Sequence, residues 1–148
     1  MSNCDDIVEQ WFTKTVQIYP GLMSEFLRTE KDPFRNPVGH ALRTSMPTLV
    51  QEIFGEMNRE RLSQALDDIL RIRAVQDLSP SEAVGFIFLL RTLLQTTLSI
   101  PSSTLEERVD QLALMAFDQY MQCREQVAQV RANEVARRSS PRRAVSWH

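Results

Sequence analysis

A capped and strongly apolar segment near the middle of the chain constrains the fold more than any other part of the sequence. Ser79-Pro80-Ser81-Glu82 combines an N-cap serine, a proline at the first helical position and a glutamate able to close a capping box. Apolar residues then occupy nearly every side of a helix expected to reach about Ser99, as in an element buried among other helices. They are Val84, Phe86, Ile87, Phe88, Leu89, Leu90, Leu93, Leu94 and Leu98.

Four earlier segments also place apolar residues at helical spacing. Asn36 as N-cap followed by Pro37 predicts the start of the third segment, and Pro47 inside it predicts a kink. No segment shows sustained alternation of apolar and polar residues, so we expect no sheet. The four helices are expected to run from just after Asn3 to Tyr19, from Leu22 to Leu27, from Pro37 to near Gly55 and from about Arg59 to Val75.

A second capping signal, Ser103 to Glu106, opens a last helix expected over about 104–137, which is roughly 50 Å long at 1.5 Å per residue. Its apolar face narrows beyond Cys123 and there resembles a weak coiled-coil seam. The sequence therefore predicts an all-α fold of five or six helices with a long C-terminal helix, either globin-like or a plain compact bundle. We expect one helical domain over residues 1–138 and a disordered basic tail over 139–148.

The composition bounds the class of protein. With 148 residues and 43% hydrophobic residues, the chain can bury a single core. Asp5, Asp6 and Glu9 stand where a signal peptide would need basic and then apolar residues. The most apolar stretch, 83–94, is about 12 residues long and contains Arg91, whereas a membrane span needs roughly 20 residues. We therefore expect a cytoplasmic protein without a membrane span.

Cysteine content and charge narrow the partners. Cys4 and Cys123 form neither a disulfide framework nor a zinc motif, and they are either buried inert thiols or oxidant sensors. Residues 124–148 hold six arginines against two glutamates, which leaves a charge of −6 on residues 1–123. This basic tail lacks interleaved aromatic residues apart from Trp147, so we do not expect nucleic acid as a partner.

Motifs of catalysis are missing from the sequence. It has no phosphate-binding glycine loop, no HExxH motif, no Glu-x-x-His pair and no GxSxG motif. We therefore expect no enzymatic activity, no catalytic residue and no metal site.

Two groups of residues are candidates for binding. A ligand pocket could involve His40, Arg43, Arg73, Gln76 and Asp77. His40 could ligate a metal or haem, but no second ligand follows at helical spacing, so a structural or surface role is the alternative and we expect no cofactor, haem included. Arg73 and Asp77 could instead tie a helix junction together. A partner or dimer interface could involve Tyr120, Arg124, Val127, Val130 and Arg131, and the alternative for Tyr120 and Arg124 is the edge of the core.

Several long strings, in the same order, resemble the amino-terminal domain of the RsbRD type, a family named after co-antagonists of the RsbT kinase. The resemblance covers roughly residues 8–138. The strings are Phe26-Leu27-Arg28, Glu30-Lys31-Asp32-Pro33-Phe34, Asn36-Pro37-Val38-Gly39, Leu42-Arg43, Ile72-Arg73-Ala74-Val75-Gln76-Asp77, Ser79-Pro80-Ser81, Ala83-Val84-Gly85-Phe86, Phe88-Leu89-Leu90, Phe117-Asp118-Gln119-Tyr120-Met121-Gln122-Cys123-Arg124-Glu125 and Arg131-Ala132-Asn133-Glu134.

This resemblance implies an all-helical sensor domain, often globin-like without haem, that forms dimers and whose last helix leads into a STAS output domain within the stressosome. The chain stops about where that output domain would begin, so we expect it to lack the phosphorylation sites of a direct co-antagonist. The function expected is a non-catalytic sensory or regulatory module in bacterial stress or redox signalling, a homodimer with a protein signalling partner. The alternative is a small-ligand- or haem-binding globin-like protein.

Overall fold

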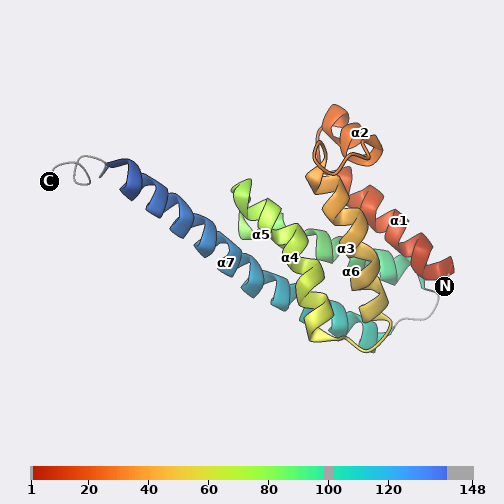
Figure 1. The fold of residues 1–148 in the computed structure, drawn as a ribbon. Coiled ribbons are helices and arrows are strands. Elements are labelled where there is room, and N and C mark those ends of the chain that lie inside the picture. Colours follow the sequence, from red (N-terminus) through yellow and green to blue (C-terminus); the bar gives the residue numbers. More distant parts are fainter. Residues whose placement is uncertain (1, 99–101, 140–148) are drawn as a thin grey trace, which may run out of the picture.

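Seven α-helices and no strand make up the part of the chain that the computed structural model describes, residues 2–98 and 102–139 (Figure 1). In chain order they are α1 Ser2–Val16, α2 Gly21–Thr29, α3 Pro37–Ile53, α4 Arg59–Val75, α5 Pro80–Val84, α6 Phe86–Thr97 and α7 Ser103–Ser139. The all-α prediction with a long C-terminal helix is confirmed. The basic tail and the expected link before Ser103 fall mostly on residues 99–101 and 140–148, which lie outside the described residues.

The core lies where α1, α3, α4, α6 and α7 pack on one another. Trp11 of α1 shows how the apolar segment is held: its ring stacks on Phe86 with centroids 5.7 Å apart, and its indole N–H donates to the Phe86 carbonyl over 2.6 Å. Both side chains are fully buried. Within the described residues α6 packs on α1, α5 and α7 but not on α3 or α4, and Phe88 on its other side is half exposed, so the apolar segment is not surrounded by helices as predicted. Other fully buried side chains of the core include Phe12, Leu42, Met46, Leu49, Leu66 and Leu70.

The apolar segment itself differs from the single helix that was expected. It is divided at Gly85 into α5 and α6, because Phe88 N–H donates to the Gly85 carbonyl three residues back, where a continuous α-helix would bond four residues back. Side chains from other helices bond to carbonyls on either side of this break: Arg73 to Glu82 and Trp11 to Phe86. The division accounts for seven helices in place of five or six.

The predicted starts of α3 and α5 are confirmed. Ser79 and Glu82 form the reciprocal capping box, and the Asn36 side chain accepts from Gly39 N–H over 2.9 Å. The buried Asn36 amide also donates to the Leu27 and Glu30 carbonyls, so one side chain joins α2 to α3. A Cβ on Gly39 would lie 2.3 Å from the Asn36 amide nitrogen, which explains why a glycine stands there. α3 continues through Pro47 as one assigned helix, whereas α1 ends at Val16, earlier than predicted.

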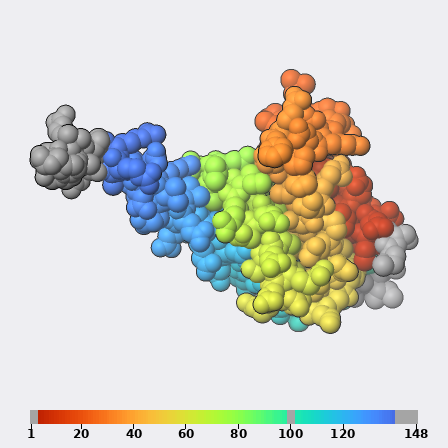
Figure 2. Space-filling view, in the orientation of Figure 1, coloured from red at the N-terminus to blue at the C-terminus, as the bar shows by residue number. Residues whose placement is uncertain are grey.

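The last helix extends beyond the rest of the molecule. Its buried residues end at Cys123, Val127 is half-buried, and every residue from Ala128 to Ser139 is exposed. Figures 1 and 2 show this segment projecting away from the helices that pack around the core. No helix among residues 2–98 and 102–139 is long and apolar enough to cross a bilayer.

Candidate functional site

A mainly apolar groove of about 690 Å³ lies where α7 leaves the body of the protein. We call it the α4–α7 groove. It is lined by Arg71 and Val75 of α4 and by Cys123, Gln126, Val127, Val130 and Arg131 of α7. Three of the five residues predicted for a partner interface, Val127, Val130 and Arg131, therefore line one surface, and Val130 is 66% exposed.

An arginine on α7 connects this groove to the turn after α4. Arg131 donates to the Asp77 carboxylate over 2.9 Å and to the Val75 carbonyl over 3.2 Å. Asp77 has a φ of 61°, a left-handed conformation that aspartate tolerates better than most residues. The contact joins one residue predicted for the ligand pocket to one predicted for the interface. Both side chains are more than half exposed, so the pair stabilises the contact only modestly.

Arg73 is the most unusual polar residue of the site, because it is only 5% exposed and no carboxylate of residues 2–98 and 102–139 pairs with it. One of its terminal nitrogens donates to the Glu82 carbonyl over 3.2 Å, and the guanidinium carbon lies 5.2 Å from the centre of the Phe86 ring. Burial lowers the pKa of this guanidinium. Its Nε atom is buried and has no hydrogen-bond partner in the part of the chain that the structure describes. The helix-junction role expected for Arg73 is the one that these contacts support.

Tyr120 does not lie on the surface, where a partner interface would need it. Its side chain is fully buried, its hydroxyl donates to the Leu78 carbonyl, and it lies 3.4 Å from the Arg73 carbonyl. Removal from water raises the pKa of this phenol. Because a fully buried ring offers no surface to a partner, Tyr120 belongs to the core and fixes α7 against the α4–α5 turn. Arg124, one turn further along α7, is exposed.

The remaining pocket candidates are exposed, in contrast to Arg73. His40 is exposed in the first turn of α3, and Gln76 is the exposed C-cap of α4. The Arg43 guanidinium lies 3.9 Å from the centre of the Phe12 ring and 3.7 Å from the Glu9 carboxylate, so it joins α1 to α3 at the surface. Of the five predicted residues, Arg73 is buried, whereas His40, Arg43, Gln76 and Asp77 are exposed. Among the described residues, no group of three or more metal-binding side chains is brought together.

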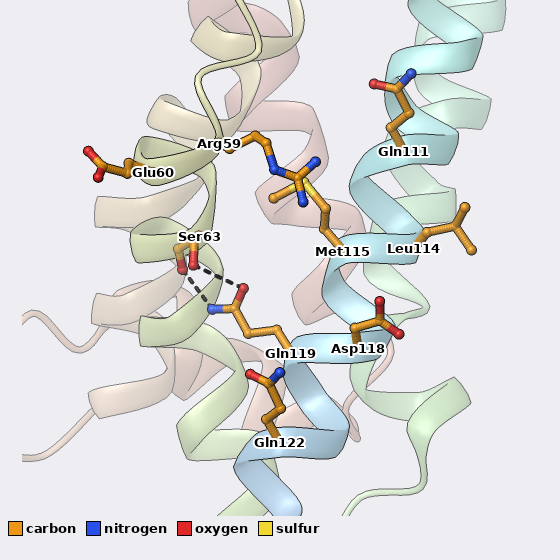
Figure 3. A pocket seen from close by; sticks show the side chains of 9 residues that line it. All are labelled: Arg59, Glu60, Ser63, Gln111, Leu114, Met115, Asp118, Gln119 and Gln122. Atoms are coloured by element: carbon orange, nitrogen blue, oxygen red, sulfur yellow. Dashed lines mark hydrogen bonds between the residues drawn. The ribbon is translucent and has the colours of Figure 1, made fainter.

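A second, polar groove of about 570 Å³ on the α4–α7 surface was not predicted (Figure 3). Within it, the Gln119 amide donates to the Ser63 carbonyl over 2.7 Å and accepts from the Ser63 hydroxyl over 3.3 Å. These bonds fix α7 to α4, whereas Leu114 and Asp118 point away from α4. Its other lining residues are Arg59, Glu60, Gln111, Met115 and Gln122.

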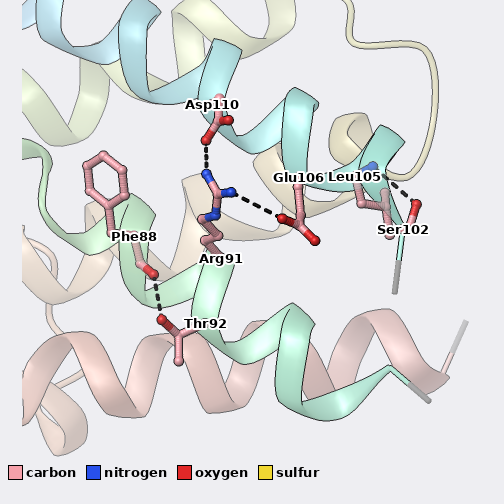
Figure 4. A network of polar contacts seen from close by, with 7 residues as sticks. All are labelled: Phe88, Arg91, Thr92, Ser102, Leu105, Glu106 and Asp110. Carbon is pink, nitrogen blue, oxygen red and sulfur yellow. Dashed lines mark hydrogen bonds and ion pairs between the residues drawn. The ribbon is translucent and has the colours of Figure 1, made fainter. Parts of the chain in front are cut away.

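An arginine in the apolar segment fixes α6 to α7 (Figure 4). Arg91 forms ion pairs with Asp110 and, over 3.1 Å, with Glu106. Because Tyr120, further along α7, contacts the earlier residue Leu78, the chain direction of α7 is opposite to that of α5 and α6. The predicted antiparallel packing of these two elements is consistent with these contacts.

The environment of Cys123 disfavours a reactive thiolate. Its thiol is buried and lies 3.9 Å from an Asp67 carboxylate oxygen. Burial, together with the negative charge of Asp67, raises the pKa of the Cys123 thiol. Since the thiolate is the form that reacts with oxidants, these surroundings favour the inert role among the two considered for this cysteine.

Comparison with known proteins identifies the family over most of the chain. Residues 5–135 match the family described as the RsbT co-antagonist protein rsbRD N-terminal domain. No curated protein and no solved structure matched the chain. The matched residues include all of α2 to α6 and most of α1 and α7. The chain therefore belongs to the RsbRD amino-terminal domain family, a family of regulatory, sensor-type domains of stress signalling.

Proposed function

We propose that this protein is a non-catalytic sensory or regulatory module of bacterial stress or redox signalling that works in the cytoplasm as a homodimer. In this proposal α7 forms the dimer contact and carries the signal to a separate signalling protein. One observation carries the proposal: α7 continues past the body as an exposed helix over residues 128–139. The family description, which names a co-antagonist of RsbT, supports a protein rather than a small molecule as the downstream partner.

A lone helical segment needs further contacts in water, which is the physical basis of the dimer proposal. Isolated helices shorter than about 12–15 residues are marginal even for favourable sequences, and most helical stability in proteins comes from packing. Among the described residues, the exposed segment contacts the body through Arg131, and its residues are exposed. Val130 and Val135 leave apolar area on it, at 66% and 64% exposure. A partner helix would remove that area from water.

The oligomeric state tests this proposal directly. Light scattering after size-exclusion chromatography on the full chain should give a dimer at micromolar concentration. A chain ending at Cys123 should give a monomer, because it lacks the exposed segment. Circular dichroism on the shorter chain is the control for folding. A full chain that stays monomeric over this range would refute the dimer, and a dimer unaffected by the truncation would refute the role of the segment.

A small-ligand site is a second candidate, and the buried, unpartnered Nε atom of Arg73 is the observation that favours it. Such a ligand would be a hydrogen-bond acceptor. We propose that it is not haem, since the imidazole of His40 stands on the exposed first turn of α3, apart from Arg73. Titration with haem should give no Soret band of a ligated haem, and His40→Ala should change nothing. A band abolished by His40→Ala would restore the haem-binding alternative.

A further inference from the structure

A small polar cleft of about 220 Å³ lies between α3 and α4, two helices that pack side by side (Figure 1). We call it the α3–α4 cleft. One wall carries hydroxyl groups from α3, and the other carries polar side chains from α4. The residues of the two walls are Thr44, Ser45 and Thr48 of α3 and Gln64, Ala65 and Asp68 of α4. None of them was predicted for binding, and none lines the α4–α7 groove.

The two walls of the cleft run in opposite directions, because α3 and α4 pack on each other and are joined by the short connection 54–58. Arg61, which also lines the cleft, donates to the Gln51 side chain over 3.0 Å and sets the register at one end. Seven residues from this pair along each helix, which is about 10 Å, Asp68 stands opposite Thr44. Asp68 and Thr44 therefore lie at the end of the cleft away from Arg61.

The floor of the cleft holds a hydroxyl group that no described residue satisfies. Ser45 is 2% exposed, and its Oγ atom is buried without a hydrogen-bond partner among residues 2–98 and 102–139. A helical serine often donates to the carbonyl four residues back, but here the Ala41 carbonyl accepts from the Thr44 hydroxyl over 3.2 Å. Ala65, with its small side chain, also lines the cleft and leaves room there. Because an unsatisfied buried hydroxyl costs free energy, the floor favours a bound polar molecule.

The charges around the cleft favour a cation as its ligand. Asp68 is exposed and forms no ion pair within the part of the chain that the structure describes. Arg61, at the other end, is paired with Glu52 over 2.9 Å. Arg71, one turn beyond Asp68 on α4, is held mainly by Asp67. The cleft therefore carries the uncompensated negative charge of one carboxylate.

The polar groups that accompany Asp68 in the cleft offer hydrogen-bond acceptors. The Thr44 hydroxyl donates to the His40 and Ala41 carbonyls, so its oxygen is left to accept. The Gln64 side chain has no hydrogen bond within the described residues, so its carbonyl oxygen is a further acceptor. A primary ammonium group carries three N–H donors on one atom. Such a group matches one carboxylate accompanied by neutral acceptors.

The volume of the cleft and the Ser45 hydroxyl define the rest of the ligand. A water molecule takes up about 30 Å³ of liquid, so 220 Å³ admits a molecule of only a few non-hydrogen atoms. A hydroxyl on that molecule would offer Ser45 both a donor and an acceptor. We propose that the α3–α4 cleft binds a small amino alcohol in its protonated form, with the ammonium group at Asp68 and Thr44 and the hydroxyl at Ser45. Neither α7 nor Arg73 lines the cleft, so this site is independent of the proposed dimer.

Titration of the full chain with ethanolamine, followed by nuclear magnetic resonance, tests the site. We expect saturable shifts confined to the amides of residues 44–48 and 61–68. Tetramethylammonium has the same charge but no N–H donor, and ethylene glycol has hydroxyls but no charge. At equal ionic strength each should bind at least about tenfold more weakly than ethanolamine. No saturable shift at tens of millimolar ethanolamine, or equally strong binding of tetramethylammonium, would overturn the proposal.

Two substitutions separate the role of the charge from that of the buried hydroxyl. Asp68→Asn should weaken ethanolamine binding by at least about tenfold, whereas Asp118→Asn, at an exposed aspartate of α7 outside the cleft, should leave it unchanged. Ser45→Ala should weaken binding several-fold without lowering the thermal stability of the ligand-free chain, because the lost hydroxyl has no partner among the described residues. Circular dichroism checks that each variant folds. Wild-type affinity in Asp68→Asn, or a marked loss of stability in Ser45→Ala, would contradict these assignments.

Discussion

From Ser103 to Cys123, α7 buries six residues against the other helices, whereas from Ala128 to Ser139 it buries none. The first half is held by Tyr120, Gln119 and the ion pairs to Arg91. Among the contacts given for the described residues, the second half is joined to the body by Arg131 at the α4–α5 turn and otherwise forms local pairs such as Glu134 with Arg138 at 3.3 Å. One continuous helix thus contains a segment that the fold stabilises and a segment that is available to a partner.

The two halves of α7 differ in how firmly they are held. Helical propensity and i,i+4 pairs contribute only a few tenths of a kcal/mol per residue or pair, so packing decides how firmly a helical segment is held. The exposed segment can therefore gain stability when a partner packs on it. The angle at which it leaves the body depends on the contacts that hold the first half of α7. Tyr120, Arg73 and the turn at Asp77 lie at the point where this angle is set.

The largest expected difference between the two halves comes from removing one apolar side chain from each. Leu112 is fully buried, so Leu112→Ala should lower the free energy of unfolding by about 2–5 kcal/mol through lost burial and a cavity. Val135→Ala in the exposed segment should change it by less than about 0.5 kcal/mol. Denaturant unfolding of both variants in dilute solution measures this. Equal losses would mean that the exposed segment is packed within the single chain.

A smaller effect is expected where Tyr120 fixes the end of the packed half. Tyr120→Phe keeps the ring but leaves the Leu78 carbonyl without its donor, which should cost about 1–2 kcal/mol of unfolding free energy. Chemical denaturation at neutral pH gives the value. Because Arg91 contacts a different part of α7, Arg91→Ala should add to this loss independently, and strong non-additivity would argue against separate attachment points.

The same phenol predicts how stability depends on pH. Burial raises the pKa of Tyr120 in the folded protein above its ordinary value of about 10, so folding favours the neutral phenol. Its contribution is therefore complete below pH of about 10 and is lost as the pH rises from there through the folded-state pKa. The wild-type chain should lose more stability than Tyr120→Phe over this alkaline range. Parallel curves for the two proteins would show that Tyr120 does not titrate as its burial implies.

The sequence predicted the helices better than the tertiary contacts between them. Capping residues act locally, so Ser79 and Asn36 identified helix starts that the structure confirms. The break at Gly85 has no capping or proline signal of its own in the sequence, and the carbonyls beside it are bonded by Arg73 and Trp11, which belong to other helices. The helical spacing of Tyr120 fits both the packed face of α7 and the edge of that face. Its hydrogen bond to the Leu78 carbonyl, from another element, shows that it belongs to the packed face.

The candidate surfaces show the same limit. The valines beyond Cys123 were visible as a narrow stripe, because helical spacing alone places them on one face. Leu114, Phe117 and Met121 have an equally regular spacing, but the sequence does not distinguish them from the packed face of the helix. Whether an apolar residue on a long helix faces the core or the solvent depends on which side α4 and α6 occupy, and periodicity does not contain that information.

The smallest expected effect concerns the link between the two halves of α7. Arg131→Ala removes an exposed ion pair with Asp77, so it should change the global free energy of unfolding by less than about 1 kcal/mol. It should nevertheless speed amide hydrogen exchange over residues 128–139 in dilute solution by about two- to fivefold, because this contact joins the exposed segment to the body. Arg137→Ala, which removes a pair with Glu134 inside the same segment, is the matched control. If both substitutions speed exchange equally, local helix stability alone orders the segment, and the turn at Asp77 has no part in directing it.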